Sequence, residues 1–560
     1  MTASGLVSRA GRPAARAGIR VPGRPLLRTL RPMPELQRLR ADHAPAVLAF
    51  ERANRAFFAA SVPDRGDDYF TDYPARHAAL LAEQEAGVCH FHVLVAEETG
   101  EVLGRFNLMD VADGAAELGF RLAEKATGRG LATSTVDRLL DLCRTTYGLT
   151  TLRARATLTN TASRAVLSRT GFVETGEEVE LSGERGVAYV RELFVPGLEL
   201  SRRFYVEAVR PLLEEAVPGI AHSAARLGSG SEVLGFDTAR SADHEWGPRL
   251  QVFLHPRDVA RHGAAVTTLL SERLPKTFHG YPTHFTTAAD AGIGVMRETE
   301  GPVSHRVEVT DPATWFTARL GFDPGREITV TDWLAAPTQR LAEVTAGAVF
   351  HDGLDRLAPA RAALDWYPHD LWLHLLACQW QRVSQEEAFV GRCGEVGDEL
   401  GSAVVAARLV RDLMRLCLLM DRRYPPYGKW LGSAFARTPQ APTLTPYLTA
   451  ALAATDWHTR EHHLARAYET VAAAHNRLGL TAPVDPTTRP YHDRPFQVLH
   501  AERFTEALTT HITDPTVRAL PMTGAADQFL DNTDVLSDPA LTRGATWGVV
   551  GAAGEPPART

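Results

Sequence analysis

Hydrophobic and polar positions in the first third of the chain change repeatedly between the strand period and the helix period. Two β-rich runs flank Glu98-Thr99-Gly100 in the segment VCHFHVLVAEETGEVLGRFNLMDV, which predicts a hairpin. A further strand is predicted for AAELGFRL, and apolar residues at helical spacing follow it at Val136, Leu139, Leu140 and Cys143. Another strand and an amphipathic helix are predicted for LTTLRARATLTNTASRAVLSRTGF. This alternation predicts an α/β (α+β) fold.

A second set of elements begins after Pro196-Gly197, where turn-forming residues mark a domain boundary. An amphipathic helix is predicted for LELSRRFYVEAVRPLLEEAV, and two strands, IAHSAARL and RLQVFL, flank a Gly-Ser corner at residues 228–231. From about residue 331 to 515 the pattern is nearly all helical, and its longest helix, DELGSAVVAARLVRDLMRLCLLMDRRYPP, is closed by Pro425-Pro426. We expect residues 516–560 to form a loosely packed tail.

Composition and charge limit the classes of protein to which this chain can belong. Its 560 residues are too many for one ordinary core, which predicts two or three domains. A formal net charge of -7 argues against nucleic-acid binding through overall charge. No run approaches the roughly 20 apolar residues of a membrane span. Five cysteines without a C-x-x-C pair predict reduced thiols, and we therefore expect a cytoplasmic protein.

Residues 1–31 are rich in arginine, glycine and proline and contain no acidic residue. They lack the apolar stretch of a secretory signal. We interpret this segment as a disordered basic leader. A start codon placed too far upstream is the alternative interpretation.

A glycine-containing turn joins the strand AAELGFRL to the helix that follows it. Its candidate ligand-binding residues are Lys125, Gly128, Arg129, Gly130 and Ala132. Glycines let the backbone approach a ligand closely, and the free N–H groups at a helix start favour a phosphate. Asn160 and Ser163 stand at the start of the next predicted helix. They form a second candidate ligand-binding motif, in addition to the glycine-containing turn.

These two motifs, together with the order of the strands, resemble the GNAT acetyltransferases, and within them the branch of ribosomal-protein N-terminal acetyltransferases. The resemblance covers about residues 32–197. It implies that the backbone amides of residues 125–132 bind the pyrophosphate of acetyl-CoA, and that Asn160 and Ser163 contact its pantetheine and phosphate region. The segment NRAFFAASVPDRGDDYFT shapes the acceptor side in that branch. The implied reaction is acetyl transfer to an amine.

Glu117, in AAELGF, stands where this family often places a carboxylate that deprotonates the amine directly or through water. The alternative is a solvated strand residue. Several relatives place a tyrosine acid three residues before the Gly171-Phe172 pair, but Ser168 occupies that place here. We therefore assign no general acid and expect water to protonate the leaving thiolate.

Asp243 and Glu245 lie one residue apart between the Gly-Ser corner and the next strand. Two carboxylates spaced in this way on an extended backbone can hold a hard cation through oxygen ligands. Gly230-Ser231 has a better spacing to Asp243 than Gly228-Ser229, so this pair is the predicted phosphate-cradling turn. The alternative is a polar turn in which Asp243 accepts backbone N–H bonds.

The stretch GSGSEVLGFDTARSADHEW resembles the nucleotidyltransferase superfamily. Together with the helical segment downstream it is similar to a bacterial nucleotidyltransferase-like family of unassigned function, over about residues 199–515. The resemblance implies Mg²⁺ and a nucleoside triphosphate, with the metal at Asp243 and Glu245. His244 departs from the pattern, because the superfamily prefers an apolar residue between the two acids.

Further residues would complete this implied site. Glu308, in HRVEVTDP, is the candidate third carboxylate, with Asp311 as the fallback. Lys429, flanked by aromatic residues in YPPYGKWLG, is the preferred cation for the triphosphate. A basic helix face is the other candidate, and its alternative interpretation is a salt-bridged stripe. That face carries Arg408, Arg411 and Arg415.

We therefore expect a GNAT domain at 32–197, a nucleotidyltransferase-like α/β core at 199–330 and an all-helical domain at 331–515. The expected partner is an amine acceptor, either a protein N-terminus or a small molecule, with no membrane and no nucleic acid. Three alternatives stay open. The chain is a bifunctional aminoglycoside-type antibiotic-modifying enzyme, its second module is a catalytically silent nucleotide-sensing domain, or the two halves act independently.

Overall fold

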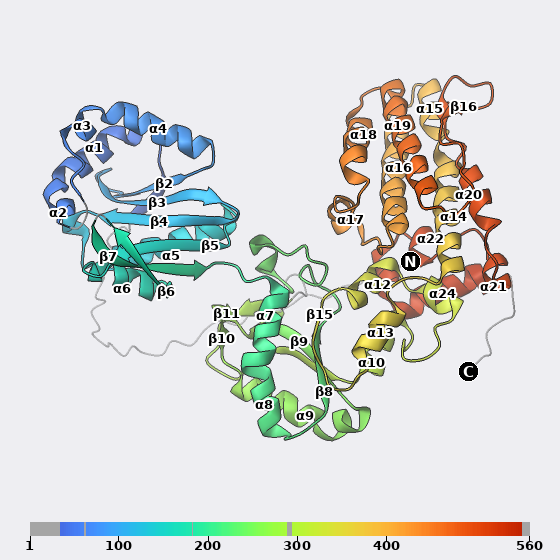
Figure 1. Ribbon diagram of the computed structural model, residues 1–560, viewed down its shortest axis with the longest axis horizontal. Helices are drawn as coiled ribbons and strands as arrows, with labels where there is room; N and C mark the ends of the chain where they lie inside the picture. Colours follow the sequence, from blue (N-terminus) through green and yellow to red (C-terminus); the bar gives the residue numbers. More distant parts are fainter. Residues whose placement is uncertain (1–33, 61–62, 182, 288–293, 552–560) are drawn as a thin grey trace, which may run out of the picture. The chain divides into compact units, whose positions relative to one another are not determined.

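A computed structural model describes residues 34–60, 63–181, 183–287 and 294–551. The predicted leader lies outside the described residues. The chain divides into two compact units (Figure 1). Unit 1 consists of residues 1–141 and 151–191, and unit 2 consists of residues 142–150 and 192–560.

A seven-stranded sheet with the order β1-β2-β3-β4-β5-β7-β6 forms the centre of unit 1 (Figure 1). Its strands are β1 (Glu35–Arg38), β2 (His90–Val95), β3 (Val102–Ala112), β4 (Ala115–Leu122), β5 (Thr151–Thr157), β6 (Val173–Leu181) and β7 (Glu184–Glu192). Strands β2 and β3 pair in antiparallel fashion around the predicted turn, which confirms the hairpin. Strands β4 and β5 are parallel.

Six helices accompany this sheet in the described part of unit 1. They are α1 (Ala44–Ala53), α2 (Arg55–Ala59), α3 (Asp67–Thr71), α4 (Tyr73–Glu85), α5 (Leu131–Thr145) and α6 (Thr161–Arg169). The apolar positions predicted at helical spacing in α5 are all buried, as expected for a helix with one apolar face. The expected α/β class is confirmed.

The parallel ladder between β4 and β5 is short. It joins Ala115–Glu117 to Thr151–Arg153, while the two strands continue to Leu122 and Thr157. Among the described residues, the later peptide groups of β4 therefore have no ladder partner in β5. Peptide groups at such an opening can hydrogen-bond a ligand that carries amide groups.

Unit 2 is built on a four-stranded mixed sheet with the order β14-β9-β8-β15 (Figure 1). The strands are β8 (His222–Arg226), β9 (Arg249–Leu254), β14 (Arg306–Thr310) and β15 (Ala348–Asp352). Strand β9 is parallel to β14 and antiparallel to β8, and β15 is antiparallel to β8. Three short hairpins accompany them: β10 (Thr277–Phe278) with β11 (Tyr281–Pro282), β12 (His284–Thr287) with β13 (Gly294–Arg297), and β16 (Arg489–Pro490) with β17 (Gln497–Val498).

Helices form the rest of the described part of unit 2. The sheet region contains α7 (Gly197–Phe204), α8 (Arg210–Ala216) and α9 (Pro256–Arg273), and a π-helical turn (Tyr205–Val209) joins α7 to α8. The following helices are α10 (Pro312–Leu320), α11 (Val330–Ala335), α12 (Thr338–Thr345), α13 (Leu357–Ala363), α14 (His369–Glu386), α15 (Phe389–Glu395), α16 (Glu399–Met420), α17 (Gly428–Phe435), α18 (Ala441–Ala453), α19 (Trp457–Arg477) and α20 (Glu502–Thr509). The long predicted helix is α16.

One hydrophobic core joins the sheet and the helices of unit 2. Leu227 and Phe253, from the sheet region, belong to the same buried cluster as Leu376 of α14 and Leu413 of α16. This shared burial is the reason that the two regions form one compact unit. The boundary predicted near residue 330 therefore separates two kinds of secondary structure within that unit.

The C-terminal segment packs more closely than a loose tail. It forms α21 (Pro515–Arg518), α22 (Ala526–Phe529), α23 (Thr533–Ser537) and α24 (Pro539–Val550). Ala525 and Ala526 are buried, and the Gln528 side chain donates to the carbonyl of Leu375 at 3.1 Å. The segment docks through Val517, which belongs to the main buried cluster of unit 2, and through small and polar side chains that the hydrophobic pattern of the sequence does not reveal.

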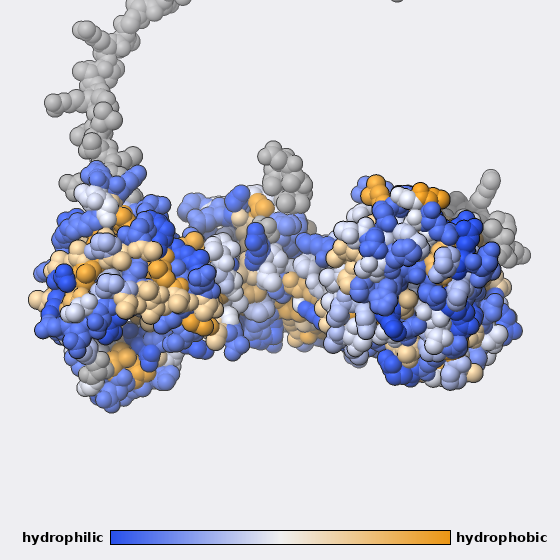
Figure 2. All heavy atoms as spheres, turned by 90° about the horizontal axis from the view of Figure 1, so that it is seen from above, coloured by the Kyte–Doolittle hydropathy of each residue, from blue (hydrophilic) through white to orange (hydrophobic). Residues whose placement is uncertain are grey.

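Hydrophilic side chains cover most of the face that Figure 2 shows for each unit, with hydrophobic patches among them. Large apolar side chains are exposed near the start of α16, where Val396 is 80% and Leu400 is 78% exposed. Scattered exposed apolar residues are normal for folded proteins. The described residues contain no helix with both the length and the apolar character that a membrane span requires.

Glu387, between α14 and α15, predicts a pH-dependent stability. Its carboxyl group is buried and accepts N–H bonds from Leu499 and Ala501, at 2.6 and 2.9 Å, and burial raises its pKa to about 7. The unfolded chain releases this proton near pH 4.5, whereas the folded chain keeps it until about pH 7. Stability should therefore fall by about 3 kcal/mol between these pH values.

Urea denaturation followed by tryptophan fluorescence checks this prediction, because all nine tryptophans lie in unit 2. Glu387→Gln carries no titratable proton, so its stability should change less between pH 4.5 and 7 than that of the wild type. Glu506→Gln, at an exposed position of α20, is the control and should keep the wild-type pH dependence. An unchanged pH dependence in Glu387→Gln would contradict the prediction.

Candidate functional site

The predicted cofactor loop of unit 1 lies directly before α5. Gly128 and Gly130 have φ angles of 71° and 74°, in the left-handed region that favours glycine. A Cβ atom at either position would meet no atom within 4 Å, so these glycines serve the backbone conformation rather than close packing. Arg129 is exposed, and Ala132 lies in the first turn of α5. The N–H groups at this helix start can bind a phosphate.

The Lys125 side chain turns to a neighbouring acid. Its Nζ lies 2.5 Å from the Glu101 carboxylate, and both side chains are more than half exposed. Such an exposed pair is weak. Lys125 can therefore exchange this partner for a ligand phosphate at little cost.

Asn160 and Ser163 meet at the start of α6. The Asn160 Oδ1 atom accepts a hydrogen bond from the Ser163 backbone N–H at 3.0 Å, which makes Asn160 the N-cap of this helix. The structure thus gives Asn160 a structural role. Contact of either residue with a cofactor stays a prediction.

Glu117 lies on β4, at the last rung of the ladder with β5. Its carboxylate accepts hydrogen bonds from Arg155 Nε at 2.9 Å and from Arg155 Nη2 at 2.8 and 2.7 Å. The side chain of Glu117 is 22% exposed, so it is neither buried nor freely solvated. Arg155, on β5, holds the carboxylate at the point where the two strands separate.

A cavity of unit 1 lies beside α6 and has a volume of about 450 Å³. Its lining residues are Thr161, Arg164, Ser168, Phe172, Glu174 and Tyr189. The Tyr189 hydroxyl donates to Glu174 at 2.8 Å and accepts from Arg164 Nε at 3.0 Å. Burial is the main cause that raises the pKa of Tyr189. Ser168, at the place where relatives have a tyrosine, thus shares this cavity with a tyrosine from β7.

The predicted acceptor-side segment forms α2 and α3. A small cavity of about 20 Å³ is lined by residues of this segment, among them Phe58 and Asp64, and by Arg121 of β4. Arg55 donates to Asp64 and Asp67, at 2.5 to 2.9 Å. The segment therefore faces the strand that also carries Glu117.

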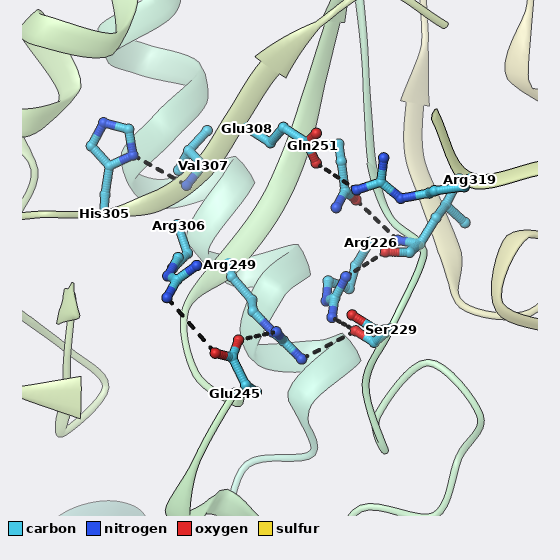
Figure 3. Close-up of a pocket in the computed structure, with 11 residues that line it drawn as sticks. Arg226, Ser229, Glu245, Arg249, Gln251, His305, Arg306, Val307, Glu308 and Arg319 are labelled. Atoms are coloured by element: carbon cyan, nitrogen blue, oxygen red, sulfur yellow. Dashed lines mark hydrogen bonds and ion pairs between the residues drawn. The ribbon is translucent and has the colours of Figure 1, made fainter. Parts of the chain in front are cut away.

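A cavity of about 350 Å³ lies in unit 2, at the edge of the sheet (Figure 3). Its lining residues are Arg226, Leu227, Ser229, Glu245, Arg249, Gln251, His305, Arg306, Val307, Glu308 and Arg319. They come from the end of β8, the Gly-Ser corner, the starts of β9 and β14, and α10. Three regions that the sequence points to therefore meet in one place: the Gly-Ser corner, Glu245 and Glu308.

Glu245 is held by backbone and by two arginines. It has a φ of 44°, its carboxylate accepts the Gly294 N–H at 2.5 Å, and its own N–H donates to the Gly294 carbonyl at 2.8 Å. Arg249 Nη1 and Arg306 Nη2 lie 3.6 and 3.8 Å from its two carboxylate oxygens (Figure 3). These distances describe ion pairs that are too long for hydrogen bonds.

Glu308 also has partners within the protein. Its Oε2 accepts hydrogen bonds from Arg319 Nη2 and from Trp315 Nε1, both at 3.1 Å. The fallback residue Asp311 caps α10 by accepting the Thr314 N–H at 3.0 Å. Asp311 thus has a structural role at the start of α10, and its fallback role as a ligand stays a prediction.

The predicted metal site consists of Asp243, Glu245 and Glu308. Asp243 ends a short 3₁₀ helix (Ala239–Asp243), and its side chain lies outside the described part of the chain. The other two line the same cavity, and each is paired with arginine. Within the residues that the structure describes, no group of three or more His, Cys, Asp or Glu side chains could hold a metal ion. The metal site stays a prediction.

The Gly-Ser corner presents Ser229 to the cavity, whereas the predicted turn was Gly230-Ser231. The Ser231 hydroxyl donates to the Ser241 hydroxyl at 3.4 Å. Gly230 has a φ of 149°, and a Cβ atom there would collide with the Glu232 carboxylate and lie 2.6 Å from Arg249 Nη2. This glycine is needed because the corner passes directly over a buried ion-pair cluster.

Lys429 is exposed at the start of α17 and does not line the described cavity. Its Nζ lies 4.9 Å from the centre of the Trp430 ring, and Trp430 stacks on Phe236 with ring centres 5.1 Å apart. A role for Lys429 at a triphosphate stays a prediction. The arginine face of α16 forms salt bridges with acids of other segments, and its role at a triphosphate stays a prediction. These pairs are Arg408–Glu386, Arg411–Asp531 and Arg415–Asp527.

Sequence reasoning missed the arginines of this cavity and the buried Glu232 below them. A signal exists in the alternation of RLQVFL and HRVEVT, which places Arg249 with Gln251 and Arg306 with Glu308 on the same face of each strand. The parallel register then sets Arg306 opposite Arg249 and Glu308 opposite Gln251. Only the pairing of distant strands brings the four residues together.

Two segments of the chain match known families. Residues 35–173 match the GNAT acetyltransferase domain, and residues 333–431 match a domain of unknown function, DUF4037. An uncharacterised N-acetyltransferase, p20 of Bacillus licheniformis, is 33% identical over 85 residues, which are 15% of this chain and 48% of that protein. The chain thus spans about half the length of this curated relative.

Solved acetyltransferase structures are similar to part of the chain. Ribosomal-protein-S5-alanine acetyltransferase from Vibrio fischeri is 18% identical with a TM-score of 0.28, covering 29% of this chain and 93% of that one. RimJ of Mycobacterium smegmatis, in complex with CoA-disulfide, is 27% identical with a TM-score of 0.26, covering 28% of this chain and 80% of that one. The family match confirms the predicted GNAT domain. The nucleotidyltransferase-like nature of the second region stays a prediction.

Proposed function

We propose that unit 1 transfers the acetyl group of acetyl-CoA to an amine. The match of residues 35–173 to the GNAT acetyltransferase domain carries this proposal. Two features of the fold fit the cofactor. The left-handed Gly128 and Gly130 let the backbone before α5 turn its N–H groups toward a pyrophosphate. The later peptide groups of β4, beyond Glu117, can hydrogen-bond the pantetheine amides.

Acetyl-CoA supplies the acetyl group as an activated thioester. The attacking amine must lose a proton, and Glu117 is the proposed acceptor of that proton. Arg155 is the proposed positioning residue, because its hydrogen bonds fix the orientation of the Glu117 carboxylate. The leaving thiolate takes its proton from water, since Ser168 stands in place of a tyrosine.

The proposed acceptor is an amine of a protein N-terminus or of a small molecule. The acceptor-side segment in α2 and α3 supports the first, because it resembles the corresponding segment of N-terminal acetyltransferases and faces β4. An aminoglycoside is the second candidate. It would present several amines to the same carboxylate.

A coupled assay for released CoA thiol tests the proposal, with a peptide that has a free N-terminus, spermidine or an aminoglycoside as acceptor. Gly130→Ala should raise the KM for acetyl-CoA about tenfold, because a side chain in left-handed backbone costs about 1–2 kcal/mol. Gly176→Ala is the control, since its φ of 80° and open surroundings are similar but it lies in β6. A wild-type chain that neither binds acetyl-CoA nor releases thiol would overturn the proposal.

Nucleotidyl transfer by unit 2 is a second candidate, because Ser229, Glu245 and Glu308 line one cavity. It would require Mg²⁺ held by carboxylate oxygens. The arginine partners of both glutamates compete with such a metal, so the described residues do not fit it without rearrangement. Release of pyrophosphate from Mg-ATP, lost in Glu308→Gln, would establish this activity and favour a bifunctional antibiotic-modifying enzyme over a silent nucleotide-sensing domain.

A further inference from the structure

Beneath the cavity of unit 2, buried positive charge exceeds buried negative charge. The side chains of Arg226 and Arg249 are 3% and 10% exposed, and they share the single carboxylate of Glu232, which is 1% exposed. Both guanidinium groups donate to the same oxygen, Oε1, at 2.8 to 3.0 Å. Two buried cations therefore face one buried anion. A buried charge without full compensation is costly.

The remaining partners of these arginines are mostly backbone carbonyls around the Gly-Ser corner. Arg226 donates to the carbonyls of Leu227 and Ser229, and Arg249 donates to that of Ser229 at 3.3 Å. Burial and the neighbouring Arg226 lower the pKa of Arg249 to about 10. The direction of this shift agrees with a surplus of positive charge around Arg249.

The mouth of the cavity adds two further arginines, each beside one glutamate. Arg306 is 44% exposed, and among the described residues it has a 3.8 Å ion pair with Glu245 and a cation–π contact with Phe285, while Arg319 is 25% exposed and pairs with Glu308. Four arginines and two glutamates line the cavity, and Glu232 below adds one further negative charge. The described cluster therefore has one more positive than negative charge, and its arginines converge on one space (Figure 3).

We propose that this cavity binds a phosphate or pyrophosphate group of a small molecule directly through its arginines, without a divalent cation. Guanidinium groups match phosphate oxygens through paired N–H donors and stay charged when partly buried. Arg306 supplies the exposed donors at the entrance, and Arg249 supplies positive charge at the base. The volume of about 350 Å³ suits a small ligand, because small-molecule sites span about 300–1,000 Å³.

The two glutamates of the cavity are the reason that we expect phosphate binding to need no metal ion. Glu245 and Glu308 would be the ligands of a cation, but each already faces a guanidinium group. An incoming phosphate competes with Glu245 for Arg306, and their 3.8 Å separation makes this exchange easy. The inference is independent of acetyl transfer, which concerns unit 1.

Titration calorimetry on the full chain tests the proposal, with inorganic pyrophosphate as the probe in the presence of EDTA. Gly130→Ala is titrated in parallel, because weaker pyrophosphate binding in that variant would place the probe at the glycine loop of unit 1 and overturn the proposal. Arg306→Gln and Arg319→Gln should each raise the Kd at least about tenfold, because each loses charge-assisted hydrogen bonds. Arg257→Gln, on α9 and outside the described cavity, is 85% exposed and should leave the Kd unchanged.

ATP is titrated in parallel, with EDTA and with Mg²⁺, to separate a nucleotide from a simple phosphate compound. Tighter binding of ATP than of pyrophosphate, in EDTA and with the same arginine dependence, would support a nucleotide as the source of the phosphate. Binding that appears only with Mg²⁺ would overturn the proposal in favour of a metal site. An equal loss of affinity for pyrophosphate in Arg257→Gln and Arg306→Gln would also overturn the proposal. So would a wild-type chain that does not bind pyrophosphate.

Discussion

Glu117→Gln is expected to lower the kcat of acetyl transfer by about 10²–10⁴-fold, the usual contribution of a general base. Glutamine keeps the size of the side chain and can still accept a hydrogen bond from Arg155, but it cannot take a proton from the amine. Steady-state kinetics at saturating acetyl-CoA check this expectation.

Glu178→Gln is the matched control for Glu117→Gln. Glu178 also pairs with an arginine of the neighbouring strand, Arg185, but both side chains are at least 70% exposed. We expect wild-type kcat in this variant and unchanged affinity for acetyl-CoA in both. If Glu117→Gln kept the wild-type kcat, or changed only the KM for acetyl-CoA, Glu117 would not be the base.

Glu232→Gln is expected to lower the free energy of unfolding of unit 2 by about 3–5 kcal/mol, the loss typical of breaking a buried ion pair from one side. The substitution leaves Arg226 and Arg249 buried with no carboxylate between them. Burial alone would raise the pKa of Glu232, but the two arginines outweigh it and lower that pKa. The negative charge of Glu232 therefore stabilises the fold at neutral pH.

Urea denaturation followed by tryptophan fluorescence measures this loss, because unit 1 contains no tryptophan. Glu300→Gln is the control, since Glu300 is fully exposed and should leave the stability unchanged. Pyrophosphate should restore part of the loss in Glu232→Gln if the cavity binds anions as proposed. A loss below about 1 kcal/mol would mean that the arginines need no buried counter-charge.

Local patterns of the sequence identify much of unit 1. The apolar spacing in α5 predicts the buried face of that helix, since a helix with one apolar face must cover a core. Gly128 and Gly130 mark the turn before it, and both have the left-handed torsions that glycine allows. These features depend on residues close together in the chain. Sequence reasoning can therefore find them without knowledge of the fold.

The partners of the candidate residues depend on contacts between distant segments. Glu117 appears in the sequence as a solitary acid, and only the parallel pairing of β4 and β5 brings Arg155 to it. Helix α22 is short and has no apolar periodicity, yet Gln528 is buried against α14. The hydrophobic periodicity of a sequence indicates which face of a helix or strand is apolar. It does not indicate which other element packs against that face.

Local sequence patterns are enough to predict most elements of unit 1, the GNAT resemblance and the glycine turn before α5, because torsion preference and apolar spacing are local properties. They also point to the Gly-Ser corner, Glu245 and Glu308 as candidate site residues. The electrostatic character of the cavity in which these residues meet depends on the folded structure. Arginines from β8, β9, β14 and α10 converge there, and the balance of buried charges is a property of the assembled fold alone.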